Sequence, residues 1–285
     1  MLRVLQACTK MKNTLFFDTP KSIVAVLDHY YYSVAPTIAF SNRLRFLQTG
    51  ISVKKTSNLK MLVLDTAGPI VDRYSLAPVI AFQLAGKQLG LGLTEEDMIP
   101  YLGKSKRLHI DEMMKQPHLL QQFKFKNKRD FDSSDANYFY HLYLREQLEI
   151  LQRIPLFSEI LPEFQIMQKT LQIFHPDLLY AQTSGYPLEV MKFLGHRLKT
   201  QGFIPNVMRC SGHTTYRKDM IQQCLDQFSI RVENVAFVSD QQSDLDAANE
   251  LKVFSIGVTH SVPSFRNANA VCANMKEVAH VLCQF

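Results

Sequence analysis

The chain has 285 residues, of which 46% are hydrophobic and 20% charged, and its formal net charge is +6. This length and composition are ordinary for a globular protein of one or two domains. The basic residues are scattered apart from one denser patch, and aromatic residues do not alternate with them in a nucleic-acid-binding pattern. We therefore expect no nucleic-acid partner and a solvated surface at that patch, which consists of Lys124, Lys126, Lys128 and Arg129.

The five cysteines are widely spaced and form no C-x-x-C or Cys/His cluster. This spacing argues against structural zinc and against a secreted disulfide scaffold, and it favours a reducing compartment. No uninterrupted run of 18 apolar residues occurs, so no transmembrane helix is expected.

Residues 1–58 are predicted to form an N-terminal extension for targeting or docking. The first 17 residues contain Arg3, Lys10 and Lys12, apolar residues between them, and no acid. This pattern resembles a mitochondrial presequence, and the alternative is an ordinary basic amphipathic start. We expect a mitochondrial protein, with the cytoplasm as the alternative location.

The first predicted strand is the apolar run 60–64, which a glycine-containing loop follows. A helix is then expected over 76–89. A second helix is expected to begin after Thr94, which is a favourable N-cap residue and is followed by three acids. From there to about residue 151 the chain is polar and helical, without strand patterns.

Strands and helices alternate again after this block. The predicted strands are 178–182, 206–209, 235–238 and 253–258, and the predicted helices are 187–198, 218–228 and 243–251. Repeated strand, loop and helix units indicate an α/β protein with a doubly wound parallel sheet. We predict an α/β core over 59–77 and 156–285, with a helical domain over 78–155 inserted after the first strand.

The chemistry is expected where the predicted strands end, because open α/β sheets bind ligands at the carboxyl ends of their strands. Asp65, the pair Ser184-Gly185 and Asp240 stand at three such ends, and Asp244 follows close behind. Converging carboxylates favour Mg²⁺, which prefers carboxylate and phosphate oxygens. The Thr-Ser-Gly turn ahead of a helix offers amides and a hydroxyl to an anion, and Arg217 adds a positive charge.

Each of these signals alone is weak, since an aspartate at a strand end is often only a helix cap. Their joint occurrence in order along one sheet is more specific. The order Asp65, Thr183-Ser184-Gly185, Arg217 and Asp240-x-x-x-Asp244 resembles the four motifs of the haloacid dehalogenase (HAD) superfamily. That resemblance implies a Rossmann-like core with an inserted α-helical cap.

Within the superfamily, the likeness is to phosphonoacetaldehyde hydrolase, or phosphonatase. The stretch D-T-A-G-P-I-V-D from Asp65 resembles that family's D-x-A-G-T-T-V-D, and Q-T-S-G-Y resembles its T-T-G-Y turn. The segment L-G-K-S-K-R-L-H from Leu102 is similar to the cap segment with the family's Schiff-base lysine. Lys106 falls on that lysine and His109 on the histidine three positions later. Taken alone, this run could also be a basic surface at a helix start.

The resemblance implies a role for each matching residue. Asp65 would attack phosphorus, Lys106 would form an imine, and His109 would shuttle protons. The phosphoryl oxygens would contact Ser184, Gly185 and Arg217, while Tyr186 and Asp244 would support the site. Mg²⁺ would be held by Asp65, the Ala67 carbonyl and Asp240.

Ala67 and Lys106 are chemically consistent with each other. Superfamily phosphatases use an acid two residues after the nucleophile to protonate an alkoxide, and Ala67 stands there instead. A carbon leaving group needs an acceptor for its electrons rather than that acid. A lysine imine provides one, because it can become an enamine.

Several positions depart from the family pattern. Pro69 replaces a threonine, which removes a hydroxyl and a backbone N–H from the nucleophile loop. Ser239 replaces a glycine and adds bulk before the metal-binding aspartate. Ser75 stands where the family often has a cysteine, and the loop around Arg217 is short, which leaves its register open.

We therefore expect a Mg²⁺-dependent hydrolase that cleaves the P–C bond of phosphonoacetaldehyde or a related small phosphonate. One alternative is a catalytically impaired HAD-fold subunit of a larger, mitochondrial assembly. The other is a HAD phosphohydrolase with a different small substrate. The oligomer implied is either a homodimer formed through the cap or a subunit of a larger complex.

Overall fold

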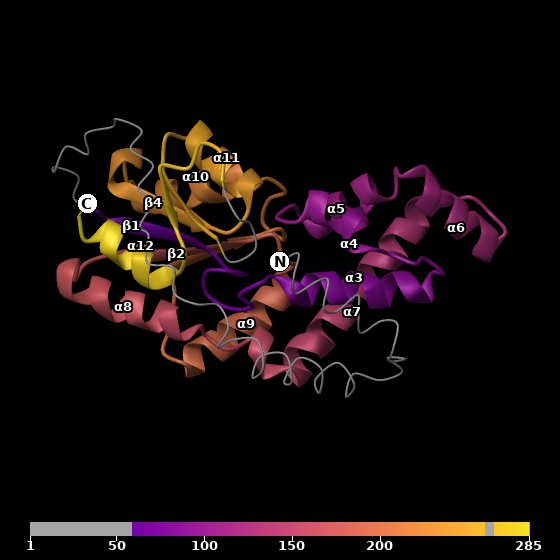
Figure 1. Cartoon of the computed structure of the whole chain (residues 1–285), viewed down its shortest axis with the longest axis horizontal. Coiled ribbons are helices and arrows are strands. Elements are labelled where there is room, and N and C mark those ends of the chain that lie inside the picture. Colours follow the sequence, from indigo (N-terminus) through magenta and orange to yellow (C-terminus); the bar gives the residue numbers. More distant parts are fainter. Residues whose placement is uncertain (1–58, 260–264, 285) are drawn as a thin grey trace. The chain divides into compact units, whose positions relative to one another are not determined.

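The computed structural model describes residues 59–259 and 265–284, which include both the sheet and the helical block (Figure 1). The N-terminal extension 1–58 lies outside the described residues, so the predictions of a presequence and of a docking arm remain predictions. None of the helices in the described part combines the length and the apolar character needed to span a membrane.

The sheet has six parallel strands in the order β3-β2-β1-β4-β5-β6. The strands are β1 (Met61–Asp65), β2 (Leu179–Ser184), β3 (Val207–Cys210), β4 (Val235–Ser239), β5 (Phe254–Val258) and β6 (Ala270–Cys272). The predicted α/β class with a doubly wound parallel sheet is confirmed. The chain moves outward from β1 to β3 and then returns to the other side of β1, so the order reverses between β1 and β4. Ligands of open α/β sheets bind at such a reversal.

The central strand β1 is apolar because both of its faces are covered. Leu62 and Leu64 belong to the hydrophobic cluster on one face, and Met61 and Val63 belong to the cluster on the other. All five residues of the strand are buried. This two-sided burial explains why β1 has a continuous apolar run rather than an alternating one.

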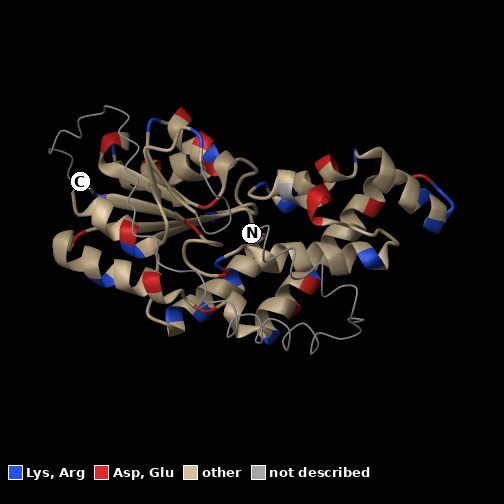
Figure 2. Cartoon of the chain, in the orientation of Figure 1, with Lys and Arg blue, Asp and Glu red and all other residues tan. Residues whose placement is uncertain are grey.

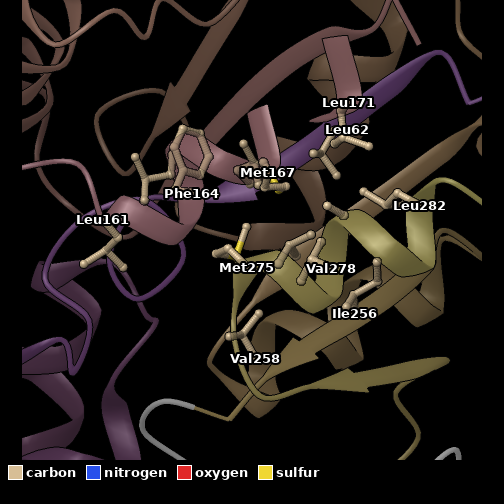
Figure 3. Close-up of a cluster of buried hydrophobic side chains, with 14 of the residues drawn as sticks. Leu62, Leu161, Phe164, Met167, Leu171, Ile256, Val258, Met275, Val278 and Leu282 are labelled. Atoms are coloured by element: carbon tan, nitrogen blue, oxygen red, sulfur yellow. The ribbon is translucent and has the colours of Figure 1, made fainter. Parts of the chain in front are cut away.

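Helices α8 (Pro162–Phe174) and α12 (Met275–Leu282) pack together and cover one face of the sheet (Figure 3). Helices α10 (Arg217–Phe228) and α11 (Gln242–Glu250) pack on the opposite face. Helix α9 (Leu188–Thr200) follows β2, and the short helix η4 (Val232–Asn234) precedes β4. The positions of α9, α10 and α11 agree with predicted helices, whereas α8, α12 and β6 were not predicted.

Between β1 and α8 the chain forms helices and loops, with α3 and α5 packed on α7. The elements are α3 (Leu76–Gln88), α4 (Glu95–Met98), η2 (Ile99–Tyr101), α5 (Lys106–Met113), α6 (Pro117–Asn127), α7 (Ser133–Arg153) and η3 (Pro155–Phe157). Asp132 begins α7 with a capping box, since its side chain accepts from the Ser134 and Asp135 amides.

Lysine and arginine positions are interspersed with acidic positions along the described helices (Figure 2). In the denser basic patch, Lys124 pairs with Asp130 at 2.9 Å, and Arg129 pairs with Asp135 at 2.5 Å. All four basic residues of the patch are exposed, in agreement with the predicted solvated surface.

Candidate active site

The predicted site residues stand at the carboxyl ends of three adjacent strands. Asp65 ends β1, Ser184 ends β2, and Asp240 follows β4 directly. Because β2 and β4 are the two hydrogen-bonded neighbours of β1, these ends share one edge of the sheet. The site therefore lies at the point where the strand order reverses.

Arg217 connects two of the acids. Its Nε and Nη2 lie 2.9 Å from the two oxygens of Asp244, a bidentate arrangement. Its Nη1 lies 3.0 Å from an oxygen of Asp65. Arg217 is the first residue of α10, one position earlier than the predicted helix start, and this placement brings its guanidinium into the site. All three side chains are buried.

Burial raises the pKa of Asp65 to about 8, with Asp244 and Asp240 adding to the rise and Arg217 opposing it. Burial likewise raises the pKa of Asp244, against the lowering influence of Arg217 and Ser239. Additional positive charge close to Asp65 would favour the ionised form of its carboxyl, the form that can bind a cation or act as a nucleophile.

Asp240 is fixed from three sides. Ser75 Oγ donates to its Oδ2 at 3.3 Å, and Gln241 Nε2 donates to its Oδ1 at 3.1 Å. The backbone of Gly68 packs against the carboxylate so closely that a Cβ there would lie 2.6 and 2.7 Å from its two oxygens. Gly68 also has a φ of +86°, so both its conformation and its contact require glycine.

The donor set around Asp240 suits a hard divalent cation. Asp240 is close enough to Asp65 to raise the pKa of the Asp65 carboxyl. The bridge between Ala67 and Val71 uses the carbonyls of Thr66 and Val71, which leaves the Ala67 carbonyl outside it. Two carboxylates and a carbonyl are all-oxygen ligands of the kind that Mg²⁺ binds. No group of three or more His, Cys, Asp or Glu side chains with metal-binding geometry occurs in the described part of the chain.

The loop that follows Asp65 accommodates Pro69. The amides of Gly68, Ile70 and Val71 all donate to carbonyls inside the loop, so the missing N–H at position 69 costs the loop none of these bonds. The loop then ends at Asp72, whose buried carboxylate accepts from the Leu76 and Ala77 amides and caps α3.

Lys106, the first residue of α5, is buried with 3% of its surface exposed. Its ammonium lies 5.8 Å from the ring centre of Tyr186. Burial lowers the pKa of Lys106 to about 8, and the charges of Asp65, Arg217 and Asp244 also act on it. Among the described residues, no carboxylate forms an ion pair with this ammonium. The structure thus brings the predicted imine-forming lysine to the predicted nucleophile.

His109 is fully buried one turn beyond Lys106, with its ring 4.2 Å from that of Phe82 and 5.6 Å from that of Tyr101. Neither of its ring nitrogens has a hydrogen-bond partner among the described residues, and the same holds for the hydroxyl of Tyr186. Burial lowers the pKa of His109 well below its ordinary value, with Lys106 adding to the effect. A neutral imidazole is therefore present at neutral pH, able to accept a proton.

The loop before α5 lies directly on the turn after β2. A Cβ on Gly185 would lie 2.7 Å from the Gly103 carbonyl oxygen and 2.8 Å from that of Lys104. On the same turn, the Tyr186 amide donates to Ser184 Oγ at 3.1 Å. The turn is thus present at the end of β2 and contacts the loop that leads to Lys106, while its binding of phosphate stays a prediction.

Sequence reasoning did not identify several supporting residues. Asp72, Ser75 and Gln241 contact the site or cap its helix, as described above. Asp72 carried a sequence signal, because an aspartate four residues before a predicted helix is a common cap. Ser239 was expected to add bulk near the ligand, but its hydroxyl instead donates to Asp244 Oδ2 at 3.1 Å and accepts from the Gln241 amide.

Solved structures with this architecture are HAD-like proteins. A haloacid dehalogenase-like hydrolase from Bacteroides fragilis superposes with a TM-score of 0.60 at 12% identity, covering 78% of this chain and all of that one. A phosphonoacetaldehyde hydrolase-like protein from Oleispira antarctica superposes with a TM-score of 0.71 at 19% identity, covering 80% of this chain and 94% of that one. The chain has the haloacid dehalogenase fold.

The sequence comparison agrees with the HAD fold. The chain is 25% identical over 212 residues to the phosphonoacetaldehyde hydrolase of Paraburkholderia xenovorans, covering 73% of this chain and 78% of that protein. It is 24% identical over 209 residues to that of Latilactobacillus sakei, covering 72% and 77%. No protein-family model matches the sequence. The resemblance inferred from the motifs, to the HAD superfamily near phosphonatase, is confirmed.

Proposed function

We propose that this chain is a Mg²⁺-dependent HAD hydrolase that cleaves the P–C bond of phosphonoacetaldehyde or a closely related small phosphonate. The observation that carries the proposal is Lys106, a buried lysine whose pKa is lowered to about 8 beside Asp65 and Arg217. An amine that is partly unprotonated near neutral pH can attack a carbonyl. Hydrolysis of a phosphate ester does not require an amine that forms an imine, whereas cleavage of a P–C bond in this way does.

The residues divide the reaction between them. The Lys106 amine condenses with the substrate aldehyde, which releases water and leaves a protonated imine. An Asp65 oxygen then bonds to phosphorus as the P–C bond breaks, and the electron pair of that bond forms an enamine. Protonation of the enamine carbon and attack of water on the imine release acetaldehyde. A second water hydrolyses the aspartyl phosphate, which frees phosphate and regenerates Asp65.

The remaining residues would bind the phosphoryl group, transfer protons and bind the metal ion. Arg217 Nη1 and the Ser184-Gly185 turn would bind the phosphoryl oxygens. His109, neutral and without a hydrogen-bond partner among the described residues, would accept and return the protons of imine formation. Asp65, Asp240 and the Ala67 carbonyl would hold Mg²⁺, which supplies the positive charge that keeps the carboxylates ionised.

The test is phosphate release from phosphonoacetaldehyde in the presence of Mg²⁺, together with borohydride trapping of the imine. Wild-type protein should release phosphate and be inactivated by borohydride only when the substrate is present, with the label on Lys106. Lys106→Arg keeps the positive charge but cannot form the imine, so it should lose both activities.

Lys104→Arg is the matched control, since Lys104 is a half-buried lysine of the same loop whose ammonium lies over the Tyr101 ring. In Lys104→Arg, borohydride should trap the imine on Lys106 to the same extent as in the wild type. Absence of trapping in the wild type, or equal trapping in Lys106→Arg, contradicts the proposal. Such a result would favour a HAD hydrolase of another substrate or a non-catalytic subunit.

A further inference from the structure

Ser239 ends β4 and is fully buried, at the position where the HAD motif ordinarily has glycine. Its hydroxyl oxygen accepts from the Gln241 amide at 3.1 Å. Its hydrogen is directed to Asp244 Oδ2, also at 3.1 Å. A hydroxyl has one hydrogen to donate, so the amide contact leaves that hydrogen for Asp244.

Asp244 in turn fixes the guanidinium of Arg217. Its two oxygens accept from Nε and Nη2, and such a two-point contact sets the plane of the guanidinium group. The remaining nitrogen, Nη1, is buried and forms an ion pair with an oxygen of Asp65 at 3.0 Å. It has no aligned hydrogen-bond acceptor among the described residues. Because Nη1 carries two hydrogens, it can donate to a ligand oxygen while it stays paired with Asp65.

We infer that Ser239 is a positioning residue that acts through Asp244 to aim Arg217 Nη1 at an oxygen of the bound phosphoryl group. The inference rests on the proposed function only in requiring that the site binds a phosphoryl oxyanion. Without the Ser239 hydroxyl, Asp244 keeps Arg217 but loses the contact that fixes its own plane. The position of Nη1 relative to the phosphoryl oxygen is then less well defined.

The experiment measures binding of inorganic phosphate in Mg²⁺ buffer by isothermal titration calorimetry. Ser239→Ala should bind phosphate about tenfold more weakly than the wild type, the effect of one hydrogen bond to a charged group. Ser239→Thr restores the hydroxyl and should recover most of the affinity. In Asp244→Asn, adding Ser239→Ala should change the affinity by less than about twofold, because the two residues act in series.

Ser255→Ala is the matched control. Ser255 is a fully buried serine on the neighbouring strand β5, and its hydroxyl bonds to Asn249 and Asn269 rather than to the site. It should lower the melting temperature as Ser239→Ala does but leave phosphate binding unchanged. This separates a role in the site from a role in the fold.

Equal phosphate affinity in the wild type, Ser239→Ala and Ser255→Ala would overturn the inference, and so would additive effects with Asp244→Asn. A wild type that binds phosphate with the expected dependence on Ser239, yet releases none from phosphonoacetaldehyde, would contradict the proposed reaction while supporting this role. A wild type that binds no phosphate would overturn both.

Discussion

Replacing Gly185 with alanine tests whether the contact between the two loops places Lys106. Gly185 does not need glycine for its backbone conformation, since its φ is not positive. The Cβ of an alanine at position 185 would instead collide with the backbone of the facing loop. It would lie 2.7 Å from the Gly103 carbonyl oxygen and 2.8 Å from the Lys104 carbonyl oxygen. The substitution therefore perturbs one contact and little else.

Ordinary van der Waals contact begins at 3.4 Å, so the loop would have to retreat by 0.6 to 0.7 Å, the difference between 3.4 Å and these two distances. Lys106 follows this loop within two residues and would move with it. A displacement approaching 1 Å costs about 10²-fold in rate, so we expect kcat/KM to fall by roughly 10- to 100-fold. Overpacking should cost about 1–3 kcal/mol of stability.

Two assays report the result. One is phosphate release from phosphonoacetaldehyde, and the other is acetylation of Lys106 by acetic anhydride, followed by mass spectrometry. The second does not depend on the reaction: retreat of the loop should expose Lys106 and accelerate its modification. Gly195→Ala is the matched control, since nothing lies within 4 Å of a Cβ at that helical position. It should be as stable as the wild type or about 1 kcal/mol more so.

If acetic anhydride modifies Lys106 of folded Gly185→Ala protein at the wild-type rate, the contact between the two loops does not place Lys106. Loss of activity with unchanged acetylation would mean that Gly185 acts on the phosphoryl group and not on the lysine.

Three further predictions concern charge and capping. Lys106→Met should be more stable than the wild type at pH 7 by up to about 3 kcal/mol, because the buried lysine has a pKa of about 8 instead of 10.5 and its charged form destabilises the fold. This cost is complete below pH 8 and disappears as the pH rises from 8 to 10.5. Denaturant titrations of both proteins at pH 7 and 10.5 should therefore show a difference in stability at pH 7 that is lost at pH 10.5. In Arg217→Lys, the lysine cannot contact both oxygens of Asp244, so kcat/KM should fall on the order of 100-fold. An unchanged kcat/KM would contradict the role assigned to Arg217. Asp132→Ala removes the capping box of α7 and should lower the free energy of unfolding by about 1 kcal/mol, measured by thermal melts. The value of kcat/KM should stay unchanged. A loss of activity in this variant would mean that α7 takes part in the site.

The central strands were predictable because burial on both faces makes a parallel strand a short apolar run. β6 was not, since three residues at the sheet edge form no pattern. Helix α12 was missed although its signal is present: Asn274 caps it, and Met275, Val278, Ala279 and Leu282 recur with helical spacing.

The strand-end residues of the site were predictable from the sheet rule, and Lys106 from its likeness to a known motif. The contacts that hold these residues in place were not predictable from the sequence. The meeting of Gly185 with Gly103 and the hydrogen bond from Ser75 to Asp240 join segments 82 and 165 positions apart. Such pairings depend on how the chain closes in three dimensions, and no local pattern encodes them.

The site residues differ in what the protein would lose without them. Arg217 joins the end of β1 to the segment after β4, so Arg217 and Asp244 would contribute to stability even in a protein without catalytic activity. Lys106 is the opposite case, because a buried cation without a paired carboxylate among the described residues lowers stability. The presence of this lysine in the site therefore supports the proposed reaction more strongly than the presence of the ion-paired arginine does.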